Sequence, residues 1–166
     1  AQAFARRFQE KTRSLIAYAC VPITMAKLPA PFMVNLVAQL QFALTPWPRF
    51  CEQFSHYVSV RSDIQARFAQ QMSGQAPMLR NRIYEAMIFS ASFEPAFRYP
   101  MPVAQITGGS DDRFPGAKVA MQNLSAILPE ELVECIDGAG HLVHQEKPEA
   151  FNSALLRVLT RIDARL

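Results

Sequence analysis

Residues 103–115 read VAQITGGSDDRFP and contain the clearest strand signal of the chain. Val103 to Thr107 is a short apolar run that stops at two glycines, which is typical of a buried strand followed by a turn. Leu132 to Ile136 repeats the pattern, and helices are expected over Ala117–Leu128 and Pro148–Leu166. Strand, helix, strand, helix at this spacing predicts an α/β fold with parallel strands and a right-handed crossover.

Two strands are too few for a stable sheet, so we expect other strands to complete it. The sequence also begins with Ala1 rather than Met, inside a helical pattern without a capping residue. We therefore expect a partial chain, which forms the C-terminal portion of a larger sheet with about two parallel strands and flanking helices.

Residues 1–97 show a helical pattern, with apolar residues at spacings of three and four, as in Ile64, Phe68 and Met72. No strand-like alternation is seen there, and prolines mark the starts and ends of four or five expected helices. Residues 32–44 are apolar on nearly every side, which predicts a helix covered on more than one face. Such a helix suits a buried core, a wall of an apolar substrate cleft, or both. Residues 98–166 form the second, α/β region.

Composition and charge exclude several classes of protein. The net charge is +3, from 17 basic and 14 acidic residues without a basic stripe, so a nucleic-acid partner is not expected. Cys20, Cys51 and Cys135 are odd in number and widely spaced, which predicts reduced, buried thiols rather than disulfides or a zinc site and favours the cytoplasm. The apolar run Leu15–Ala26 is too short to span a membrane, and Pro22 interrupts it, so it is not read as a secretory signal.

Two residues that could carry chemistry follow the two predicted strands. Asp111 comes just after the first strand, and His141 just after the second, on a loop with two glycines that are expected to make it supple. The carboxyl ends of neighbouring parallel strands meet at one edge of a sheet, where ligands and catalytic groups gather. A carboxylate beside an imidazole is the pair that a general base needs, because the carboxylate orients the ring and stabilises its protonated form.

The segment Met101–Leu159 resembles the C-terminal end of the α/β-hydrolase family. The family's pattern is a strand, Gly-x-x-Asp-x-x-x-Pro, a helix, a strand, Gly-His, and Glu-x-Pro at the start of the last helix. The matching residues are Gly108, Asp111, Pro115, Gly140, His141, Glu146 and Pro148.

The resemblance implies that Asp111, rather than Asp112, is the triad acid, that His141 is the triad histidine, and that residues 1–97 are a cap or lid. His144 has no strand end to position it, and His56 is expected to face solvent or to pack under the cap.

The family's nucleophile elbow, Gly-x-Ser-x-Gly after a strand, is absent from the 166 residues. Ser110 lies in the acid turn and Ser73 between helices, so neither is expected to be the nucleophile. The nucleophile is thus unknown, and both it and the oxyanion-hole segment are expected outside this chain. Gly138-Ala139-Gly140 is not a dinucleotide fingerprint, since position 143 is Val, and neither a cofactor nor a metal is expected.

The resemblance implies a hydrolase of carboxylic esters or related acyl compounds with a small apolar substrate, with this chain alone expected to be inactive. An alternative is an epoxide hydrolase or haloalkane dehalogenase with an Asp nucleophile, in which His141 activates water. A second alternative is a non-catalytic binding module derived from a hydrolase. The expected partner is the missing N-terminal half of the same protein, or an oligomeric partner that covers the sheet edge.

Overall fold

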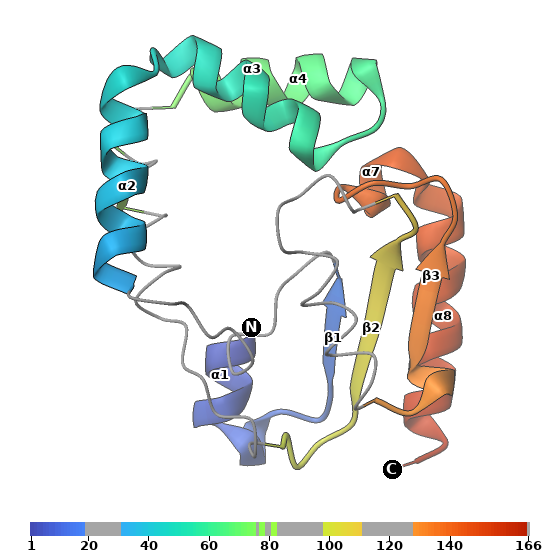
Figure 1. Cartoon of the computed structure of the whole chain (residues 1–166). Helices are drawn as coiled ribbons and strands as arrows, with labels where there is room; N and C mark the ends of the chain where they lie inside the picture. The colour runs from blue at the N-terminus through green and yellow to red at the C-terminus, as the bar shows by residue number, and fades with distance from the viewer. Residues whose placement is uncertain (19–30, 76, 79–80, 83–97, 111–127, 166) are drawn as a thin grey trace.

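The computed structural model describes residues 1–18, 31–75, 77–78, 81–82, 98–110 and 128–165 (Figure 1). The main elements are α1 (Gln2–Arg7), β1 (Leu15–Tyr18), α2 (Pro31–Leu44), α3 (Trp47–Val58), α4 (Ser62–Ser73), β2 (Val103–Gly108), β3 (Val133–Ile136), α7 (Val143–Glu146) and α8 (Pro148–Asp163). Short 3₁₀ helices cover Gln9–Lys11 and Glu130–Leu132.

The described strands form one parallel sheet in the order β1-β2-β3. All six residues of the central strand β2 are buried, as expected for a strand covered on both faces. Gln105 pairs with Val133, and Gly108 with Ile136, so β2 and β3 end together. The strands predicted near residues 103 and 132 and the α/β class are therefore confirmed.

The first strand differs from the sequence prediction, which had only helices in residues 1–97. Leu15–Tyr18 forms β1 and pairs with β2, with Leu15 opposite Val103, so the described sheet has three strands rather than about two. The N–H of Leu15 also donates to the carbonyl oxygen of Pro102 at 3.0 Å. Four consecutive apolar or aromatic residues show neither a strand nor a helix period, which explains why the pattern did not reveal them. The division of the chain at residue 97 stays a prediction.

The core lies between the sheet and α8, which forms the predicted final amphipathic helix. Alternate residues of β2 face opposite sides: Ala104 and Ile106 pack against α8, whereas Val103 packs with Ala5 of α1. The α8 side of the core is completed by Leu132, Ile136, Ala139, Val143, Ala154, Val158 and Ile162, all at most 7% exposed.

A charged cluster fastens β3 to α8 at the edge of this core. The Glu134 carboxylate accepts hydrogen bonds from Arg157 at 3.1 and 2.8 Å and from Arg161 at 2.8 Å. The bond from Arg157 is the main reason why the pKa of Glu134 lies below its usual value. The cluster therefore fixes α8 over the strand that precedes His141.

Helices α3 and α4 lie beyond the carboxyl ends of the strands, where the arrowheads point in Figure 1. The helices predicted from the apolar spacing are confirmed here, and prolines stand at the starts of two of them, with Pro31 first in α2 and Pro48 second in α3. Aromatic rings join α3 and α4, since Phe54 of α3 lies 6.1 Å from Phe68 of α4.

The prediction that residues 32–44 are covered on more than one face is wrong. Of the described α2 side chains, only Ala38 and Phe42 are buried, whereas Phe32 is 71% and Leu44 83% exposed. Met33, Leu36, Val37 and Leu40 are also exposed. Apolar composition on every side predicts burial, but among the described residues most of the apolar side chains of α2 are left exposed.

The prediction of reduced, buried thiols is correct for Cys51, whereas Cys135 is a free thiol as predicted but is exposed rather than buried. Cys135 lies on the face of β3 opposite Glu134 and Ile136, away from α8. Cys20 lies outside the described residues, as does nearly all of the helix predicted over Ala117–Leu128. No helix among the described residues has the length and apolar character needed to cross a membrane.

Candidate active site

His141 lies in the turn that follows β3, at the carboxyl edge of the sheet, as predicted. This histidine turn, Asp137–Leu142, begins where Ile136 ends the strand. Gly138 adopts a left-handed backbone with φ of 65°, which a side chain would strain. Ala139 and Gly140 are buried, and His141 is half-buried. The imidazole therefore sits on a turn that is packed into the protein rather than on a loose loop.

The end of β2 is hydrogen-bonded to the histidine turn. The N–H of Gly109 donates to the carbonyl oxygen of Ile136 at 2.9 Å, and that of Ser110 donates to Ala139 at 2.8 Å. Gly108 makes this approach feasible, because an added Cβ would lie 2.3 Å from the carbonyl oxygens of both Ala139 and Gly140. Asp111 itself lies outside the described residues. Its neighbour Ser110 is hydrogen-bonded to Ala139, which lies two residues before His141.

The histidine turn is also bonded to the α3–α4 junction, Val58–Arg61. The N–H of Leu142 donates to the carbonyl oxygen of Val58 at 2.9 Å. The carboxylate of Glu146 accepts from the N–H of Gly140 at 2.7 Å and from the N–H of Val60 at 3.1 Å. The sequence pattern included Glu146 but did not reveal these hydrogen bonds. Val60 lies 86 residues before Glu146, so no local sequence signal indicates the contact.

Comparison with solved structures identifies the fold of this chain. No protein-family model matches the sequence, and no curated protein does. Among solved structures, a thermophilic esterase from Thermogutta terrifontis matches with a TM-score of 0.71 and 18% identity, over 97% of this chain and 60% of that one. A bromoperoxidase from Bacillus anthracis matches with a TM-score of 0.66 and 18% identity, over 94% and 62% of the two chains.

An α/β-hydrolase fold protein from Burkholderia ambifaria matches with a TM-score of 0.56 and 19% identity, over 93% of this chain and 60% of that one. The chain has the α/β-hydrolase fold. It spans about 60% of the length of these structures. The α/β-hydrolase resemblance seen in the sequence is thereby confirmed at the level of the fold.

Two other histidines of this α/β-hydrolase fold lie elsewhere. His144 belongs to α7, with its ring 5.3 Å from that of Tyr18 and 6.0 Å from that of Phe151. Burial lowers the pKa of His144, and its Nδ1 has no hydrogen-bond partner among the described residues. His56 is exposed on α3, in agreement with the expectation that it faces solvent. Neither follows a strand end.

Ser73 and Ser110, neither of which was expected to be the nucleophile, lie at a helix end and in a strand-end turn. Ser73 ends α4, and its hydroxyl donates to the carbonyl oxygen of Gln70 at 2.9 Å. Ser110 lies in the turn after β2, beside the predicted acid. Within the same described part of the chain, no group of three or more His, Cys, Asp or Glu residues could hold a metal ion.

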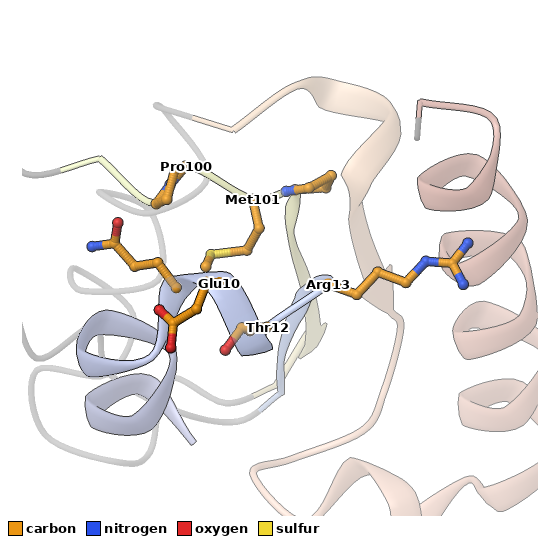
Figure 2. Close-up of a pocket in the computed structure, with 7 residues that line it drawn as sticks. Glu10, Thr12, Arg13, Pro100 and Met101 are labelled. Carbon is orange, nitrogen blue, oxygen red and sulfur yellow. The ribbon is translucent and has the colours of Figure 1, made fainter.

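A hollow of about 470 Å³ lies at the opposite end of the sheet, before the first residues of β1 and β2 (Figure 2). The residues that line it are Gln9, Glu10, Thr12, Arg13, Pro100, Met101 and Pro102. Arg13 is paired with Asp163 at 3.1 Å. In an α/β-hydrolase fold the reacting groups stand at the carboxyl ends of the strands, so this hollow is separate from the His141 site.

Proposed function

We propose that this chain supplies the acid and the base of a catalytic triad in a hydrolase of carboxylic esters or related acyl compounds. The main support is the bonding between the two strand ends. Ser110, directly before Asp111, donates to Ala139, two residues before His141, at 2.8 Å. The bond brings the residue before Asp111 to the turn that carries His141, and this supports our inference that the carboxylate and the imidazole work as a pair.

In the proposed reaction His141 takes the proton of the nucleophile as it attacks the acyl carbon, and then gives that proton to the leaving alcohol. Asp111 orients the imidazole and stabilises its protonated form. The nucleophile and the groups that stabilise the oxyanion come from outside these 166 residues, because the sequence contains no nucleophile elbow.

The choice of an apolar acyl substrate has its own support. Phe32, Met33 and Leu40 of α2 remain more than half exposed, and such side chains bind acyl or alkyl groups readily. Solved structures with this fold include esterases and bromoperoxidases, so the fold is compatible with more than one reaction. Ester hydrolysis is preferred because esterases recur among these structures.

The test is hydrolysis of p-nitrophenyl esters of increasing acyl length by the protein at its natural length. Replacing a triad histidine removes general-base catalysis, so His141→Ala should lower kcat by about 10²-fold to 10⁴-fold. His56→Ala is the matched control, since that imidazole is exposed on α3 and should leave the rate unchanged.

A kcat for ester hydrolysis that falls less than about 10-fold in His141→Ala would contradict the proposal. Activity on epoxides or haloalkanes instead of esters would favour the alternative with an Asp nucleophile. In that reaction His141→Ala should still form the covalent alkyl ester but fail to hydrolyse it, so that the intermediate accumulates.

A further inference from the structure

Glu146, the last residue of α7, is a buried carboxylate beside the histidine turn. Its side chain is 4% exposed, and among the described residues it is the one charged member of the buried set. Burying a carboxylate is costly unless its oxygens are hydrogen-bonded. Here one oxygen accepts from Gly140 at 2.7 Å and the other from Val60 at 3.1 Å.

The two bonds of Glu146 join segments that are far apart in sequence. Val60 precedes Glu146 by 86 residues, whereas Gly140 precedes it by six. A third bond strengthens the link, since Nη1 of Arg61 donates to the main-chain carbonyl oxygen of Glu146 at 3.1 Å. Glu146 therefore connects the helical region to the turn that carries His141.

The α3–α4 junction is itself well fixed. The hydroxyl oxygen of Ser59, which is 1% exposed, accepts from the N–H of Arg61 at 3.1 Å. The side-chain amide of Gln65 donates to the carbonyl oxygen of Ser59 at 2.8 Å. Arg61 is also paired with Asp63, whose hydrogen bond raises the pKa of Arg61. A carboxylate attached to this junction is thus attached to a rigid support.

His141 stands between two residues that are bonded to this support. Gly140, before it, is held through Glu146, and Leu142, after it, donates directly to Val58 at 2.9 Å. The peptide units on both sides of the imidazole are thereby placed by the α3–α4 junction rather than by β3 alone. A shift of the junction would move His141 with it.

We propose that Glu146 is a positioning residue for His141, through which the α3–α4 junction sets the orientation of the imidazole. The catalytic meaning of this inference rests on the proposed function. Glu146 touches neither substrate nor reacting atoms; it acts through the backbone of Gly140. The helical region thus helps to orient His141, in addition to any role as a cap over the active site.

The test compares Glu146→Gln with Glu149→Gln in the protein at its natural length. Glu149 lies three residues further on, in the first turn of α8, and is exposed, so its substitution removes the same charge without touching the turn. In Glu146→Gln one amide N–H of the new side chain faces a backbone N–H donor, which cannot accept it.

The first readout does not depend on activity. Glu146→Gln should speed amide hydrogen exchange at both Gly140 and Val60 by about 10-fold or more, and should change the ring-nitrogen NMR shifts of His141. The second readout is ester hydrolysis, in which kcat should fall about 10-fold or more with KM within about two-fold, because alignment rather than substrate binding is lost. Glu149→Gln should leave all of these unchanged.

Faster exchange with unchanged His141 shifts and an unchanged kcat would overturn the proposal, because Glu146 would then serve stability alone. If the His141 shifts move but the parent protein hydrolyses no ester, the positioning role stands and the proposed function fails. If Glu146→Gln does not fold, Glu146→Asp replaces it: the shorter carboxylate keeps the charge, and unchanged His141 shifts in that variant would equally overturn the proposal.

Discussion

Gly108→Ala tests how tightly the end of β2 is packed against the histidine turn. An added Cβ would lie 2.3 Å from two backbone carbonyl oxygens, those of Ala139 and Gly140, and 2.8 Å from the carbonyl carbon of Ala139. Backbone atoms cannot rotate away as the end of a long side chain can. The turn would have to retreat by about 1 Å to reach ordinary van der Waals contact.

The expected cost follows from two effects. Overpacking of a close-packed site costs about 1–3 kcal/mol. A retreat of the turn also stretches the bond from Ser110 to Ala139, now 2.8 Å, and a lost backbone hydrogen bond costs about 1 kcal/mol. We therefore expect Gly108→Ala to lower the free energy of unfolding by about 3 kcal/mol.

Gly74→Ala is the matched control. Gly74 follows α4 with φ of −71°, which any residue can adopt, and an added Cβ would lie 3.6 Å from its nearest neighbour. Its expected effect runs from zero to a gain of about 0.5 kcal/mol, because alanine restricts the unfolded chain. Urea unfolding of both variants measures the difference. A loss below about 1 kcal/mol in Gly108→Ala, or equal effects in the two variants, would refute the close packing of β2 on the histidine turn.

Two further predictions concern the core beneath His141. Glu134→Gln should lower the free energy of unfolding by about 1–2 kcal/mol near neutral pH, because its carboxylate bonds to Arg157 and Arg161 at 2.8 to 3.1 Å. The hydrogen bond from Arg157 holds the folded-state pKa of Glu134 below its usual value of 4.5, so this stability is fully present above 4.5 and is lost as pH falls through the folded-state pKa. Urea unfolding at decreasing pH should therefore show a shrinking difference between the two proteins. Ile106→Ala should lower the free energy of unfolding by about 2–5 kcal/mol in the same assay, since Ile106 of β2 is fully buried against α8. A smaller loss would mean that the neighbouring side chains move in to fill the cavity.

The sequence predicted the α/β part well, for local reasons. β2 is an apolar run closed by two glycines, and α8 carries a continuous apolar stripe at helical spacing. Both signals reside within one element and do not depend on what the element packs against. The position of His141 followed from them, because a strand end places the next residue at the edge of the sheet.

Local signals were weaker where the neighbours decide the structure. Leu15–Tyr18 is too short to show a period, and only its pairing with β2 makes it a strand. The apolar character of α2 predicted burial, but exposure depends on which segments lie beside the helix. The two glycines before His141 were expected to make the loop supple, whereas Gly138 takes a left-handed turn conformation and Gly140 is buried and hydrogen-bonded to Glu146.

The support of His141 illustrates why such features escape pattern analysis. The residues that hold it come from 58–61, 108–110 and 139–146, and no spacing within any one of these segments indicates the others. The sequence places α2, α3 and α4 between β1 and β2, which are adjacent strands of the sheet. The helical region follows β1, which ends at Tyr18, so it begins from the carboxyl edge of this parallel sheet, the edge at which β2 and β3 also end. Its junctions can therefore reach the strand-end turns, and the bonds of Val58 and Val60 to the histidine turn show that one junction does.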